Sequence, residues 1–155
     1  MFGNRLSIKK PSRLPAAQWP GAMAILAGVD LLAKFYSGND KGKVGTRFMV
    51  FLRSKYFNNL NNNDACVLYH LRNSLLHSFG LYSFDKNKEY WFTLVARYEP
   101  LIELVKTDHY KIDVMALCEN FESAVELYLT DLKSDSGLQN KFFLLFHKYG
   151  SVYMY

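Results

Sequence analysis

The sequence predicts one mainly helical domain with a small antiparallel β-meander inserted between its helices. Apolar residues recur every three or four positions over most of the chain, which is the spacing of an amphipathic helix. Between residues 81 and 113 they instead alternate with polar residues, as in a half-buried strand. A chain of 155 residues, 50% of them hydrophobic, can bury a core of its own. We therefore expect residues 1–155 to form a single domain.

The first helix is expected to follow an irregular N-terminal arm over residues 1–18, which contains two prolines. Pro20 suits the first turn of a helix, because the backbone N–H that proline lacks has no partner there. Helical spacing then continues to Gly38. Asp30 interrupts the apolar pattern of this helix, and a buried carboxylate needs a cation beside it.

Two further helices are expected over residues 44–57 and 65–79, separated by a run of asparagines. Asn63 or Asp64 can accept hydrogen bonds from the first N–H groups of the later helix. Gly80 is suited to the left-handed conformation that ends many helices. The later helix carries the most informative residues of the chain.

The alternating region predicts four strands. Residues 81–84 and 90–95 are expected to form a hairpin, and residues 101–105 and 110–114 to add two antiparallel strands, although residues 101–106 also fit a helical turn. Aromatic residues are concentrated at Tyr90, Trp91 and Phe92. Alternating aromatics in a hairpin usually belong to the core, and the alternative is a face that stacks bases.

The last two helices are expected over residues 114–132 and 138–149, each with an apolar side at helical spacing. Asp113 precedes the first of them and is its expected N-terminal cap. The acidic residues of this helix lie on its other side, which we expect to face solvent.

Composition excludes several classes of protein. Cys66 and Cys118 lie in apolar helical segments without metal-ligand spacing, which is typical of reduced thiols in a cytoplasmic protein. The chain shows no membrane span, no signal-peptide pattern, no glycine-rich nucleotide loop and no His-Glu-x-x-His motif. We therefore expect neither a membrane association nor a metal or other cofactor.

The net charge of +5 is unevenly distributed. Residues 1–80 contain eleven Lys and Arg against three acids, whereas residues 81–155 contain eight against eleven. A basic region is typical of proteins that bind phosphate-bearing partners, and the alternative is an ordinary solvated surface.

Polar residues cluster inside the apolar helix over residues 65–79. On a helix of about 100° per residue, Asn73 and His77 are one turn apart and can touch, whereas Arg72 lies roughly 140° from His77. Arg72 can reach His77 only by bending around the helix or from a second copy of the chain, which is a first indication of a dimer. Arg72 also needs an anion if it is buried, and Asp30 is a candidate.

His70 and Ser74 share the polar side of this helix with His77 and are candidate supporting residues. For His70, a simple surface position is the more ordinary interpretation.

The segment from Arg72 through Asn73 to His77 resembles the Arg-x4–6-His motif of the HEPN superfamily, in which a polar residue commonly follows the arginine. Residues 28–33 and 68–78 also resemble segments of uncharacterised bacterial HEPN-like proteins. The resemblance is best over residues 20–80 and covers the rest only in outline.

The resemblance implies a HEPN-like antiparallel helical bundle. It also implies a homodimer that forms along the helix over residues 65–79, which we call the motif helix. Catalytic members of the superfamily are metal-independent endoribonucleases, so it also implies RNA cleavage of a toxin or bacterial-defence type, with an antitoxin-type protein as a further partner. In that role His77 moves a proton, Arg72 stabilises the phosphate and Asn73 orients His77.

Two alternatives remain open from the sequence. The chain can be a non-catalytic module of the same fold that dimerises and binds a nucleotide, a nucleic acid or a protein. Arg72 can also simply bridge Asp30, with His77 placed favourably at the negative end of the helix dipole.

Overall fold

The computed structural model describes residues 18–149, which form five α-helices, one 3-10 turn and a four-stranded sheet. The mainly helical class is therefore confirmed for these residues. The elements, in chain order, are α1 (Gln18–Ser37), α2 (Val44–Leu52), the 3-10 turn η2 (Lys55–Phe57), α3 (Asn62–Ser78), β1 (Tyr82–Asp85), β2 (Lys88–Val95), β3 (Ile102–Lys106), β4 (His109–Asp113), α4 (Val114–Leu132) and α5 (Ser136–Tyr149). The expected N-terminal arm lies outside the described residues except for Gln18, which begins α1.

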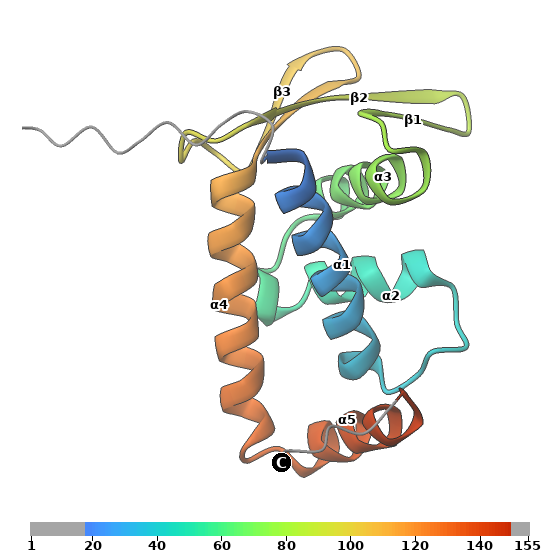
Figure 1. The fold of residues 1–155 in the computed structure, drawn as a ribbon, viewed down its shortest axis with the longest axis vertical. Helices are drawn as coiled ribbons and strands as arrows, with labels where there is room; N and C mark the ends of the chain where they lie inside the picture. Colours follow the sequence, from blue (N-terminus) through green and yellow to red (C-terminus); the bar gives the residue numbers. More distant parts are fainter. Residues whose placement is uncertain (1–17, 150–155) are drawn as a thin grey trace, which may run out of the picture.

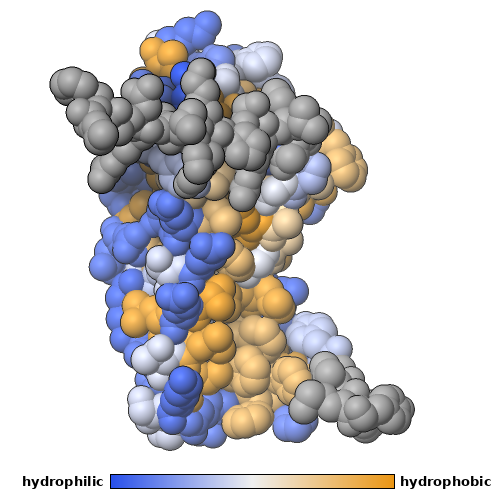
Figure 2. All heavy atoms as spheres, turned by 60° about the vertical axis from the view of Figure 1, so that its left-hand side comes forward, coloured by the Kyte–Doolittle hydropathy of each residue, from blue (hydrophilic) through white to orange (hydrophobic). Residues whose placement is uncertain are grey.

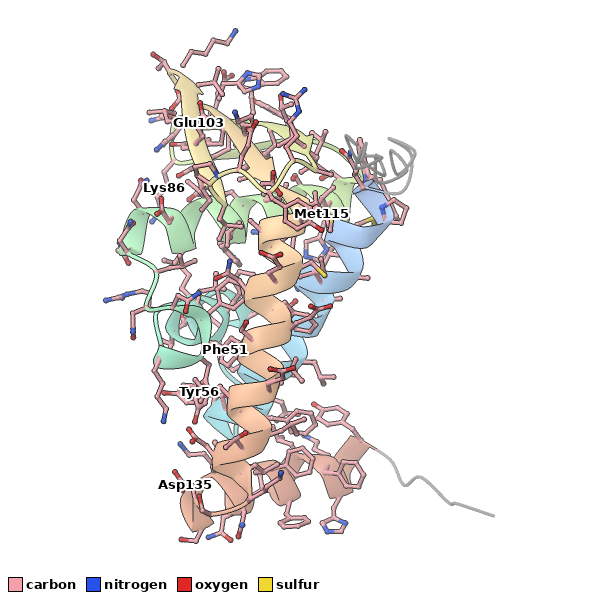
Figure 3. The ribbon with its side chains drawn as sticks, turned by 90° about the vertical axis from the view of Figure 1, so that its left-hand side faces the viewer. Phe51, Tyr56, Lys86, Glu103, Met115 and Asp135 are labelled. Carbon is pink, nitrogen blue, oxygen red and sulfur yellow. The ribbon has the colours of Figure 1, made fainter. Side chains whose placement is uncertain are left out.

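Helix α1 lies in the centre of the molecule and packs against the other four helices. The sheet covers one end of the helical layer and α5 crosses the other end (Figure 1). The buried residues of α1 follow a regular three-and-four spacing, which explains why this helix was predictable: Ala22, Leu26, Val29 and Ala33. In Figure 3, Phe51 and Tyr56 lie beside α4. The ring of Tyr56 makes a T-shaped contact with the ring of Tyr128 on that helix.

The sheet has the strand order β1-β2-β4-β3, and the expected antiparallel meander is wrong. Strands β1 and β2 form the expected hairpin, but β2 pairs in parallel with β4, and β3 lies at the outer edge of β4. The parallel pairing places Phe92 beside Tyr110 on the face that packs on the helices, where both side chains are buried. Alternation in the sequence identifies the buried face of each strand, but it does not specify which strands become neighbours.

Helix α2 ends at Leu52, five residues earlier than expected. The hydroxyl of Ser54 accepts a hydrogen bond from the backbone N–H of Tyr56 and starts the 3-10 turn η2. After this change of direction Tyr56 and Phe57 both lie in the core.

Both ends of α3 differ from expectation. Its N-terminal cap is Asn61, whose side-chain oxygen accepts from the N–H of Asp64 at 2.8 Å, rather than Asn63 or Asp64. At the other end Phe79, not Gly80, takes the left-handed conformation with φ of 49°. Gly80 instead donates its N–H to the carbonyl of Ser74 and closes the turn.

Helix α4 begins as expected, because Asp113 Oδ1 accepts from the N–H groups of Met115 and Ala116. Cys66 on α3 and Cys118 on α4 are both half-buried. None of the helices within residues 18–149 has the length and apolar character that crossing a membrane requires.

One face of the molecule gathers hydrophobic residues in a band beside a hydrophilic ridge (Figure 2). Large apolar side chains are exposed on several helices, among them Leu31 on α1, Leu129 on α4 and Phe143 on α5. The core therefore does not include every large apolar side chain of these helices.

Candidate functional site

The crossing of α1 and α3 brings Asp30 against Arg72, as the sequence indicated. Arg72 donates to Asp30 Oδ2 from Nε at 2.7 Å and from Nη2 at 2.5 Å. The two side chains are only 12% and 16% exposed, so the pair is mostly shielded from water. Breaking such a pair would leave an uncompensated buried charge. The ion pair with Asp30 therefore holds Arg72 in this orientation.

The remaining nitrogen of Arg72, Nη1, contacts the other two motif residues. It donates to Asn73 Oδ1 at 2.9 Å and lies 2.8 Å from His77 Nε2. Arginine has no acceptor, so Nε2 accepts this hydrogen bond and the proton of the neutral imidazole is on Nδ1. The side chain of Arg72 bends around α3 within one chain, and a second copy is not needed to join it to His77.

This arrangement uses four of the five N–H groups of Arg72. Asn73 and His77 do not form the direct contact that the helical wheel suggested. Instead, both contact the guanidinium of Arg72, which lies between them. The positive charge of Arg72 is balanced locally by Asp30, and the imidazole of His77 stays exposed to solvent.

The three motif residues line an open cavity of about 620 Å³ between α3, α2 and the hairpin. The residues of its wall are Val44, Tyr69, Arg72, Asn73, Ser74, His77, Ser78, Tyr82, Ser83 and Phe84. Strand β1 contributes Tyr82, Ser83 and Phe84, none of which was a sequence candidate. The alternation of β1 gave no signal for them, because their place in the site depends on how the sheet packs against α3.

Ser74 lines this cavity, but its hydroxyl donates to the backbone carbonyl of Leu71 at 2.8 Å and its side chain is buried. The proton of this hydroxyl is therefore already donated within α3 and is not free for chemistry.

His70 is buried rather than at the surface, and it does not join the Arg72 cluster. Its ring stacks on Tyr90 with centroids 3.9 Å apart, and its Nδ1 lies 3.2 Å from the hydroxyl of Ser83. Burial lowers the pKa of His70 below its usual value; Asp85 opposes this shift and Lys88 adds to it. His70 thus links α3 to β1 and β2. This packing sets the position of the β1 residues that form part of the cavity wall.

Within residues 18–149, no cluster of three or more His, Cys, Asp and Glu side chains is arranged to hold a metal ion. The chemistry that the site offers is that of a fixed guanidinium beside an exposed imidazole. In such a pair the guanidinium can bind an anionic oxygen, and the imidazole can accept or donate a proton.

Comparison of the chain with models of protein families, with curated proteins and with solved structures gave no match.

Proposed function

We propose that this protein is a metal-independent endoribonuclease of the HEPN type, in which Arg72 and His77 act together on an RNA phosphate. The observation that carries the proposal is the 2.8 Å contact between Arg72 Nη1 and His77 Nε2 at the wall of an open cavity. It is supported by the resemblance of the motif and by the excess of basic residues in the first half of the chain.

The resting contacts suggest how substrate would engage. A phosphate that enters the cavity competes for the Nη1 hydrogen bonds now made to Asn73 and His77. A bond from the guanidinium to an ionised phosphate oxygen joins two opposite charges, so it is stronger than the bonds that Nη1 now donates to the uncharged acceptors of Asn73 and His77. The exchange frees His77 Nε2. Asp30 keeps the guanidinium in place throughout, because it binds the other two nitrogens.

The cleavage itself requires no metal. The ribose 2′-oxygen attacks the neighbouring phosphorus, and its proton passes to the neutral imidazole of His77. The bond from phosphorus to the 5′-oxygen breaks, and that oxygen takes a proton from water or from the protonated imidazole of His77 in a second copy. Arg72 stabilises the additional negative charge on the phosphate during the attack.

A homodimer is part of the proposal. Phe79, directly after the motif helix, and Val44, at the cavity wall, are exposed apolar side chains beside the site. Contact of two copies along this edge would cover both and bring two imidazoles near one phosphate.

One observation favours a second candidate, a non-catalytic module that binds a nucleotide, a nucleic acid or a protein. Arg72 already directs four of its N–H groups to partners in its own chain, and Asp30 balances its charge. A purely structural Arg72 would show the same contacts.

The test is cleavage of a labelled single-stranded RNA in the presence of EDTA. His77→Ala should lower the cleavage rate by about 10²–10⁴-fold while its circular dichroism and oligomeric state match the wild type. Arg72→Lys keeps the charge but loses the planar fork, so it should also cleave poorly. His147→Ala, at an exposed histidine of α5, is the matched control and should cleave normally.

Wild-type protein that cuts none of several RNAs would eliminate the nuclease and leave the binding module. Cleavage that persists in His77→Ala would show that the activity belongs to another site or to a contaminant. Growth inhibition on overexpression of the wild type, but not of His77→Ala, would support the toxin type.

A further inference from the structure

The outer face of the sheet carries a row of aromatic side chains that the core does not use. Tyr82 on β1 and Trp91 on β2 are paired in register, with ring centroids 4.4 Å apart and planes inclined by 47°. Their side chains are 38% and 47% exposed, and Phe84, two residues along β1, is 59% exposed. By contrast Tyr90, on the opposite face of β2, is buried against His70.

A carboxylate holds the two rings in place. Glu89 Oε1 accepts from the hydroxyl of Tyr82 at 3.3 Å, and its Oε2 accepts from the indole N–H of Trp91 at 3.2 Å. The polar atoms of both rings are thereby hydrogen-bonded, and the rings pack on each other while remaining partly exposed to solvent. We call Tyr82, Trp91 and Glu89 the aromatic platform.

The aromatic platform continues the site described above. Tyr82 belongs both to the platform and to the wall of the cavity that holds Arg72 and His77. On its other side Trp91 and Glu89 line a second open cavity, of about 520 Å³, together with His109 and Lys106. One surface therefore runs from His77 across the two rings to Lys106.

Cations border this surface at two points. Lys86 is exposed in the turn between β1 and β2, at the sheet end of the molecule (Figure 3), and Lys106 is exposed at the end of β3. Lys111 lies on the same face but is bound by Glu99 and Glu103. Glu89 and Asp108 bring negative charge to the same surface. The phosphates of a polyanion would therefore lie toward Lys86 and Lys106, with its bases over the rings.

We infer that the aromatic platform binds unpaired bases of a single-stranded RNA whose phosphate enters the cavity at His77. This inference rests on the proposed function and names the part of the protein that holds the substrate beside the cut. Aromatic faces stack on any base, so the binding tolerates many sequences but requires bases that are not paired in a duplex. The bonds of Glu89 keep the rings oriented before RNA arrives, which lowers the entropy cost of binding.

Binding is tested in the His77→Ala background, in which RNA stays intact, by the fluorescence of Trp91. The chain has two tryptophans, so Trp19→Phe leaves Trp91 as the single reporter. A single-stranded oligonucleotide should quench this fluorescence, and the same sequence in a duplex should bind more weakly. Replacement Trp91→Ala, measured by anisotropy of labelled RNA, should weaken binding roughly 10- to 100-fold, whereas Trp91→Phe should keep most of it.

Tyr82→Ala is a second variant that should weaken binding in the same direction. Phe143→Ala is the matched control, because Phe143 is an aromatic residue of similar exposure on α5, and it should bind RNA as the parent does. In the cleaving protein, Trp91→Ala should raise KM and leave kcat nearly unchanged, because the rings hold substrate without touching the reacting atoms.

Unchanged RNA affinity in Trp91→Ala and Tyr82→Ala, with no quenching of Trp91, would overturn the platform while leaving cleavage by His77 intact. Loss of self-association in these variants without any change in RNA affinity would also overturn it and identify the face as a contact between copies. RNA that quenches Trp91 but is never cut by the wild type would refute the nuclease and retain the platform.

Discussion

Asp113 illustrates how much one side chain can organise. It is fully buried, and its carboxylate accepts four backbone hydrogen bonds, two from the first turn of α4 and two from the loop N–H groups of Arg97 and Glu99. Burial by itself would raise the pKa of this carboxyl, but the four N–H donors outweigh that effect and hold the pKa below its usual value. One residue thus joins β4, α4 and the loop that precedes β3.

Replacing Asp113 with Ala removes the cap of α4 and leaves buried N–H groups without partners. We expect the free energy of unfolding to fall by about 3 kcal/mol, measured by urea denaturation. Asp135→Ala is the comparison, because the exposed Asp135 caps α5 with a single bond to Leu138 and should cost about 1 kcal/mol. Equal losses in the two variants would mean that the loop bonds of Asp113 contribute nothing.

At the scale of elements, the closeness of α1 and α4 depends on a glycine. A Cβ atom built on Gly28 would lie 2.5 Å from Cζ of Phe121 on α4, well inside van der Waals contact. The ring of Phe121 therefore rests directly on the backbone of α1. Helix propensity favours alanine over glycine at such a position, so the two effects oppose each other.

Gly28→Ala should lower the free energy of unfolding by about 1 kcal/mol, since overpacking outweighs the gain in propensity. In a Phe121→Ala background the same change should instead stabilise the protein, because the obstructing ring is gone. Gly21→Ala serves as the control in the same helix, where a new Cβ meets nothing within 4 Å. Destabilisation by Gly28→Ala of the same size in both backgrounds would contradict this account of the α1–α4 contact.

At the scale of the whole molecule, the sheet and the helical layer meet at His70. This residue of α3 stacks on Tyr90 of β2 and contacts Ser83 of β1, with Asp85 and Lys88 as the charged groups that face it. Because the cavity at His77 has α3 on one side and β1 on another, its shape depends on this junction.

The junction should respond to pH. Burial holds the pKa of His70 below that of an unfolded histidine, about 6.5, so the unfolded chain binds the proton more readily. The contribution of neutral His70 to stability is fully present above about pH 6.5 and is lost as the pH falls toward the lower folded pKa. The free energy of unfolding, measured at several pH values between about 7.5 and 5, should therefore drop more in the wild type than in His70→Phe. Parallel pH profiles for the two proteins would show that His70 does not titrate with unfolding.

The sequence by itself determined the features that depend on local periodicity and on the cost of burying charge. The buried stripe of α1 and the cap at Asp113 follow from spacing within one segment. The pair of Asp30 and Arg72 was a candidate from the sequence, because a buried charge needs a partner, and the structure shows that the two residues do pair. The strands were also identified, since alternation fixes which side chains face the core.

Only the tertiary structure decided which segments became neighbours. The parallel pairing of β2 with β4 and the burial of His70 depend on contacts between residues far apart in the chain, which no local pattern encodes. Tyr82 enters the wall of the site for the same reason, because its position is set by the packing of the sheet on α3. Even the contact of Arg72 with His77, only five residues apart, required the structure, since a long side chain can bend and a helical wheel records only where its Cβ points.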